Sequence, residues 1–146
     1  MSDERVTAEL RRIVSERALA CCEYCGSQTD FSTQALAVEH IVPRIKGGQT
    51  TSDNLALSCQ GCNNHKYDKT EGRDPASGQL APLYHPRQEK WSEHFTWNSD
   101  CSSIIGTTPT GRATVATLCL NRKGLINLRR LLYETEKHPP ENFPKT

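Results

Sequence analysis

Residues 38–66 read VEHIVPRIKGGQTTSDNLALSCQGCNNHK, and this stretch decides the fold that the sequence predicts. The β-prone run 33–42 leads into a proline, and the turn-rich loop 44–54 with its paired glycines follows. LALS at 55–58 reads as a short strand, and the cysteine turn 59–62 then leads into one or two helical turns. The order strand, loop, strand, helix predicts a small α+β core.

Two cysteine pairs of the form C-x2-C stand in and before this stretch, Cys22 with Cys25 and Cys59 with Cys62. A two-residue spacer lets both sulfurs of a pair bind one tetrahedral ion, so two pairs predict an all-thiolate zinc site. Such a site has no open coordination position and is structural rather than catalytic. Free core cysteines and two local redox pairs are the alternatives.

The other cysteines do not fit the spacing of the site. Cys21 adjoins Cys22, but only Cys22 gives the two-residue spacer. Cys101 and Cys119 are expected to be ordinary small apolar residues. Cysteine pairs more often hold metal than form disulfides in a reducing cytosol, which is the expected compartment.

The composition agrees with a core that needs such a staple. Leu, Ile, Val and Phe supply only 27 of the 146 residues, and the net charge is +1. This balance indicates a thin core rather than disorder, and it leaves any basic patch to be local. The sequence contains no run of 18 apolar residues, so it predicts no membrane-spanning helix. The charged N-terminus does not have the pattern of a signal peptide.

A possible hydrolytic site lies between and just after the cysteine pairs. Each residue alone has a commoner explanation: His40 as a packed histidine, Asn54 as a turn residue, and Asn63 as a helix N-cap. Together with Glu39, they supply an imidazole, a carboxylate and amide oxygens, which is a plausible set for a metal-assisted hydrolase. Neighbouring strand residues point to opposite faces, so Glu39 and His40 can share a site only if the hairpin bends.

The stretch 38–66 strongly resembles the HNH endonuclease superfamily, and the resemblance implies its ββα-metal fold. It is most similar to small bacterial HNH proteins whose core is flanked by two zinc knuckles. The resemblance covers a nuclease core at 18–70. The later stretch 71–146 is similar to the C-terminal extension of one bacterial subgroup, which implies a single domain over 1–146 with the extension packed on the core.

The resemblance implies a role for each motif position. His40 matches the general base that takes a proton from the attacking water, and Asn54 matches the asparagine that braces the loop and orients the base. Asn63 and Glu39 match ligands of a catalytic divalent ion, for which oxygen donors favour Mg²⁺ or Mn²⁺. Glu39 is a departure, because the family usually has Asp or His there. His65 is a further candidate ligand or phosphate contact.

Double-stranded DNA is the expected partner. Arg44 and Lys46 in the loop after the base are candidates for phosphate contacts, and Lys66 matches a common basic position of the family. Residues 111–133 carry several cations and no acidic residue, which fits either a phosphate-binding face or an ordinary solvated helix face. The aromatic residues in 91–97 are expected to pack the extension onto the core.

Outside the motif, periodicity predicts helices at 5–20, with Thr7 or Asp3 as its cap, at 108–121 and at 125–137. Two further stretches, 91–98 and 102–108, read as short strands, and residues 71–86 read as irregular.

The sequence therefore predicts a metal-dependent DNA endonuclease. A zinc-stapled DNA-binding protein with weak or no catalysis is the main alternative, and a structural zinc interaction module is the third.

Overall fold

The β-hairpin and the helix after it form the centre of the protein. Strand β1 (Ala37–His40) pairs antiparallel with β2 (Leu55–Ser58), so that His40 lies opposite Leu55. Helix α2 (Gln60–Lys66) follows directly. The structure, a computed structural model, describes residues 5–141 and 143, and it confirms the α+β class and the ββα core.

Local sequence signals set the start of this helix. Cys59 is the N-cap of α2, and its Sγ lies 3.5 Å from the backbone nitrogen of Cys62, so the N-cap position is filled by a cysteine of the second pair. All four residues of β2 are buried. The second cysteine pair is therefore anchored between a buried strand and a helix.

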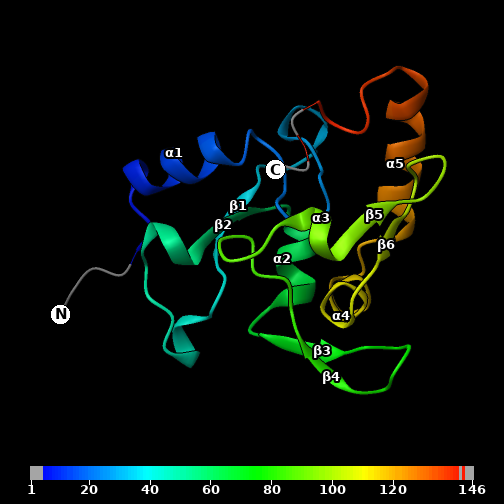
Figure 1. Cartoon of the computed structure of the whole chain (residues 1–146). Helices are drawn as coiled ribbons and strands as arrows, with labels where there is room; N and C mark the ends of the chain where they lie inside the picture. The colour runs from blue at the N-terminus through cyan, green and yellow to red at the C-terminus, as the bar shows by residue number, and fades with distance from the viewer. Residues whose placement is uncertain (1–4, 142, 144–146) are drawn as a thin grey trace.

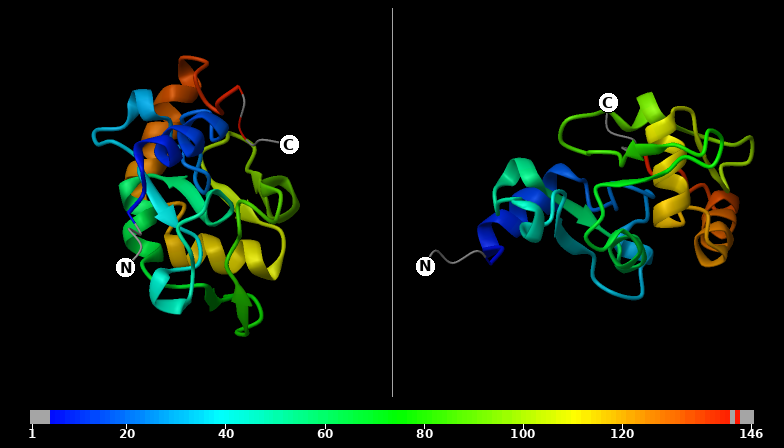
Figure 2. Two further views of the ribbon diagram at one scale, coloured as in Figure 1. Left: turned by 90° about the vertical axis from the view of Figure 1, so that its left-hand side faces the viewer. Right: turned by 90° about the horizontal axis from the view of Figure 1, so that it is seen from below.

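Helix α1 (Ala8–Arg17) packs against the outer side of the hairpin (Figure 1). Thr7, one of the two candidate caps, is its N-cap and accepts a hydrogen bond from the Leu10 backbone nitrogen at 3.1 Å. The other candidate, Asp3, lies outside the described residues. Val14 of α1 joins Leu55 and Leu57 of β2 in a small separate core. Helices α1 and α5 lie at opposite ends of the molecule (Figures 1 and 2).

The stretch predicted to be irregular, 71–86, contains a hairpin instead. Strands β3 (Glu71–Arg73) and β4 (Leu80–Pro82) pair antiparallel. Asp74 holds the turn: its carboxylate accepts from the Ala76 backbone nitrogen and pairs with Arg112 at 2.9 Å. The pairing with Arg112 lowers the pKa of Asp74 well below its usual value. The prediction was wrong because the anchoring partner lies 38 residues away.

The rest of the extension follows the prediction more closely. Helix α3 (Trp91–His94) replaces the first half of a predicted strand, and β5 (Phe95–Trp97) and β6 (Ile104–Gly106) then form a hairpin. The two predicted C-terminal helices are α4 (Pro109–Leu118) and α5 (Lys123–Glu134). No helix within the described residues is long and apolar enough to cross a membrane.

The main core joins the extension to the hairpin unit. Trp91 and Phe95 are buried together with Tyr24 of the first cysteine turn, and the Trp91 indole nitrogen donates to the Tyr24 carbonyl at 2.9 Å. Helix α2 contacts both β1 and α4 (Figure 1). The predicted packing of the aromatic cluster is confirmed, and the extension thus covers the cysteine pairs.

Candidate functional site

The four cysteines of the two pairs come together. Their sulfur atoms all lie within 4.8 Å of one another, and all four residues are buried. The Sγ atoms of Cys25 and Cys59 are 3.6 Å apart, close to the roughly 3.8 Å expected between thiolates around a tetrahedral zinc ion. The predicted grouping is confirmed, and the cluster can hold a metal ion such as zinc. Cys21 is buried but lies outside the cluster, as expected.

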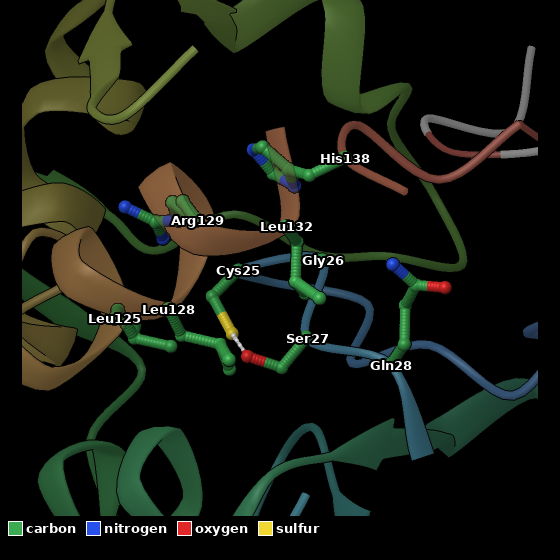
Figure 3. A pocket seen from close by; sticks show the side chains of 9 residues that line it. All are labelled: Cys25, Gly26, Ser27, Gln28, Leu125, Leu128, Arg129, Leu132 and His138. Carbon is green, nitrogen blue, oxygen red and sulfur yellow. Dashed lines mark hydrogen bonds between the residues drawn. The ribbon is translucent and has the colours of Figure 1, made fainter. Parts of the chain in front are cut away.

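The two cysteine pairs have different polar neighbours. A hydroxyl contacts the first pair, and a guanidinium contacts the second. A 3.0 Å hydrogen bond joins Cys25 Sγ and Ser27 Oγ, beside leucines of α5 (Figure 3). Arg122 donates to Cys59 Sγ at 3.3 Å and Cys62 Sγ at 3.7 Å. Burial alone would lower the pKa of Arg122, but the Cys62 and Cys59 sulfurs raise it overall. Arg122 thus supplies positive charge beside sulfurs that carry negative charge when metal is bound.

This engagement corrects part of the expected basic face at 111–133. Arg112 is paired with Asp74, Arg122 with the cysteine sulfurs, and Arg129 is buried against backbone carbonyls, including that of Leu120 at 2.7 Å. Three of the cations are therefore engaged within the protein, and the other two, Lys123 and Arg130, are exposed.

His40 is the last residue of β1 and lies at the mouth of the loop. Its Nε2 forms a 2.8 Å hydrogen bond with Thr50 Oγ1. Burial, and then the nearby Lys66 ammonium, lower the pKa of His40 below 6.5. Both effects favour the neutral ring, the state in which an imidazole accepts a proton.

Asn54 ties the two ends of the loop together. Its Oδ1 accepts from the Val42 backbone nitrogen at 2.9 Å, and its Nδ2 donates to the carbonyls of Val42 and Gln49 at 3.0 and 2.9 Å. These three hydrogen bonds are all formed by the side-chain amide of Asn54, and they make the loop after His40 a closed frame. Thr50, which contacts His40, stands next to Gln49 in this frame.

Replacing Gly48 by alanine should break this frame. A Cβ there would lie 1.7 Å from the Val42 carbonyl oxygen and 2.8 Å from Asn54 Nδ2, so the loop must move. We expect unfolding free energy to fall by roughly 1–3 kcal/mol, measured by denaturant titration. Gly124→Ala is the matched control, because nothing lies within 4 Å of a Cβ at that position. Equal stability of the two variants would show that the loop is not tightly closed.

Glu39 faces away from His40, as strand alternation predicts, and it meets partners that the sequence did not indicate. It is only 6% exposed, one carboxylate oxygen accepts a hydrogen bond from Tyr24 Oη, and the other lies 3.3 Å from Lys66 Nζ. Desolvation raises the pKa of Glu39, and the Lys66 charge acts against this rise. Both oxygens are therefore engaged within the protein, so a metal ion would have to exchange with Lys66 or Tyr24.

Lys66 differs from its expected role as a phosphate contact. It is 1% exposed, because its side chain runs inward from the last turn of α2. Asn63, the fourth residue of the same helix, is half-buried, and His65 is exposed. Of the expected DNA contacts, Arg44 and Lys46 are exposed on the 3-10 turn Arg44–Lys46.

His85 is a side chain near the strand end that the motif did not include. It lines a small cavity of about 40 Å³ together with Ile41, Val42 and Lys66. Burial is the main cause that lowers the pKa of His85. No local pattern marks this residue, because only the packing of the extension brings it to the hairpin.

Comparison with protein families gives one match. Residues 22–69 match the family described as HNH endonuclease. Neither curated proteins nor solved structures gave a match. The matched segment begins at Cys22 and contains both cysteine pairs, His40, Asn54 and Asn63, that is, the whole candidate site. Residues 22–69, about a third of the chain, are therefore similar to the HNH endonuclease family.

Proposed function

We propose that this protein is a metal-dependent endonuclease that hydrolyses phosphodiester bonds of double-stranded DNA. The observation that carries the proposal is the setting of His40, whose neutral imidazole is held by Thr50 at the mouth of a loop closed by Asn54. This geometry presents a base of suitable pKa on a rigid frame, as general base catalysis requires.

His40 would take a proton from the water that attacks the phosphorus. The hydrogen bond to Thr50 fixes the ring plane, and Asn54 fixes Thr50 through the loop. When bound, a divalent ion would stabilise negative charge on the phosphate and on the leaving oxygen.

The oxygen donors that the resemblance assigns to the ion are Asn63 and Glu39, and they suit Mg²⁺ or Mn²⁺. Glu39 fits this role only in part, because it faces away from His40 and because Lys66 lies 3.3 Å from its carboxylate. Release of one present partner would free an oxygen for the ion. His65 is exposed on the same helix as Asn63 and is the other candidate ligand.

A structural zinc ion at Cys22, Cys25, Cys59 and Cys62 completes the proposal. Four buried thiolates select zinc over hard cations such as Mg²⁺ and leave no open coordination position. The two metal sites would thus have separate tasks, one in stability and one in hydrolysis.

Nicking of supercoiled plasmid tests the proposed activity. Wild-type protein with its cysteine-bound metal intact should convert the plasmid to open circles when Mg²⁺ or Mn²⁺ is added. A chelator present only at the assay stage, followed by return of Mg²⁺, should stop and then restore nicking. Binding of the same plasmid without nicking in either metal would support the alternative, a zinc-stapled DNA-binding protein. The engagement of Glu39 by Lys66 is the observation that favours this alternative.

Arg44 and Lys46 supply a separate prediction about DNA binding. If each contacts one phosphate, Arg44→Ala with Lys46→Ala should reduce the slope of log affinity against log salt by about 2, since each contact contributes about 0.9. Fluorescence anisotropy at several salt concentrations measures this slope. Lys123→Ala is the control, because Lys123 is also exposed but lies on α5, far from the loop. An unchanged slope in the double variant would remove both residues from the DNA interface.

A further inference from the structure

Lys66 is a buried cation with oxygen partners on three successive residues at and just beyond the end of β1. Its Nζ lies 2.8 Å from the Ile41 carbonyl oxygen, 3.5 Å from the His40 carbonyl oxygen and 3.3 Å from a carboxylate oxygen of Glu39. The contacts to His40 and Ile41 are to main-chain atoms, so they act directly on the path of the backbone.

The place of these contacts gives them a specific consequence. Ile41 lies one residue beyond the end of β1, where the chain leaves the hairpin and enters the loop. Its nitrogen still donates to the Asn54 carbonyl at 2.8 Å, while its carbonyl oxygen accepts from Lys66. The two peptide groups that follow His40 Cα are therefore held by α2 through one ammonium group.

Burial decides against a role in DNA binding for this ammonium. At 1% exposure, Lys66 cannot reach a phosphate without leaving the core. Burying an ion pair costs several kcal/mol of desolvation, so the Lys66–Glu39 pair is weak evidence for added stability. The pair does fix the position of the ammonium group, because the Glu39 carboxylate and the carbonyls of His40 and Ile41 converge on it.

The same network reaches the first cysteine pair. Tyr24, which donates to Glu39, is fully buried and lies between Cys22 and Cys25 in the sequence. A chain of contacts thus runs from the cysteine knuckle through Tyr24, Glu39 and Lys66 to the strand end of the base.

We propose that Lys66 is a positioning residue for His40. It holds the carbonyls of His40 and Ile41 so that the imidazole stays directed at Thr50 and the attacking water. The inference rests on the proposed nuclease function for its kinetic consequence but not for its structural one. A misplaced base lowers kcat by as much as about 100-fold and leaves the binding of DNA unchanged.

The test compares variants that keep or remove the ammonium. Lys66→Met alone leaves Glu39 buried without its cation, so the neutral pair Lys66→Met with Glu39→Gln is made as well. Glu39→Gln alone is the reference, because Glu39 is also a candidate ligand of the catalytic ion. Relative to it, the neutral pair should keep its cysteine-bound metal and fold, and should show kcat reduced by up to about 100-fold with unchanged KM and unchanged salt dependence of DNA binding. Lys66→Arg, which keeps charge and donors, should recover part of kcat. Lys69→Met, an exposed lysine three residues on, is the control and should resemble wild type.

Two further measurements separate this inference from the proposed function. A small phosphodiester, bis(p-nitrophenyl) phosphate, removes DNA binding from the assay, and the loss of kcat should persist on it. Amide hydrogen exchange at Ile41 and Val42, together with the NMR shifts of the His40 ring, should change in the neutral pair and not in Lys69→Met.

The outcomes are distinct. Failure of wild type to cleave either substrate overturns the proposed function, and the NMR measurement then decides the inference alone. A neutral pair with wild-type kcat and unchanged His40 signals overturns the inference. A loss confined to KM and salt dependence also overturns it, because that result belongs to a phosphate contact.

Discussion

Replacing His40 by alanine is expected to abolish DNA cleavage while the metal content of the cysteine cluster and the affinity for DNA stay close to wild type. Loss of a positioned base typically costs 10²–10⁴-fold in rate. The His40 side chain contacts Thr50, and His40 is not a member of the four-cysteine group. Plasmid nicking, zinc analysis and anisotropy on one preparation measure the three quantities together.

Chemical rescue sharpens this prediction. Removing the half-buried ring leaves space at the end of β1, so added imidazole should restore part of the cleavage rate in His40→Ala. His65→Ala, a change at an exposed histidine on α2, should gain nothing from added imidazole. If His40→Ala loses its metal or unfolds, the ring is a packing residue. If it nicks DNA at the wild-type rate, another group is the base.

Local sequence signals predicted much of the fold. The N-cap at Thr7 and the proline at the start of α4 each act within one turn of helix, so the sequence alone places them. The β3–β4 hairpin could not be predicted in this way. Its turn depends on Asp74 and on the distant Arg112, and strands of three residues carry little pattern of their own.

The candidate site shows the same division. The family resemblance assigned His40 and Asn54 to one loop. In the structure His40 contacts the Thr50 hydroxyl of this loop, and Asn54 forms hydrogen bonds with its backbone. Alternation correctly sent Glu39 to the other face of the strand, but it did not show that Lys66 meets it there. The number of charges likewise did not predict which cations of the C-terminal helices are engaged within the protein. That depends on which sulfurs and carbonyls the fold places beside them.

The cysteine cluster should decide whether the protein folds at all. We expect Cys59→Ser to lose its zinc and to unfold or aggregate. Structural zinc sites bind with about 10–16 kcal/mol of apparent free energy, which equals or exceeds the roughly 5–15 kcal/mol by which whole domains are stable. Cys59 also caps α2 and accepts from Arg122, so its loss affects the helix and leaves a guanidinium without a partner.

Cys119→Ser is the matched control, because Cys119 is partly exposed and lies outside the cluster, so it should keep zinc and melt with wild type. Metal analysis and thermal melting under reducing conditions compare the two variants. A metal-free wild-type protein that melts at the same temperature would contradict the prediction, since the apolar core would then suffice. We expect the metal-free wild-type protein to melt at a lower temperature, because the main core contains all four cysteines of the cluster, Cys22, Cys25, Cys59 and Cys62. Without a metal ion, four thiols would remain buried in the core that joins the hairpin unit to the extension.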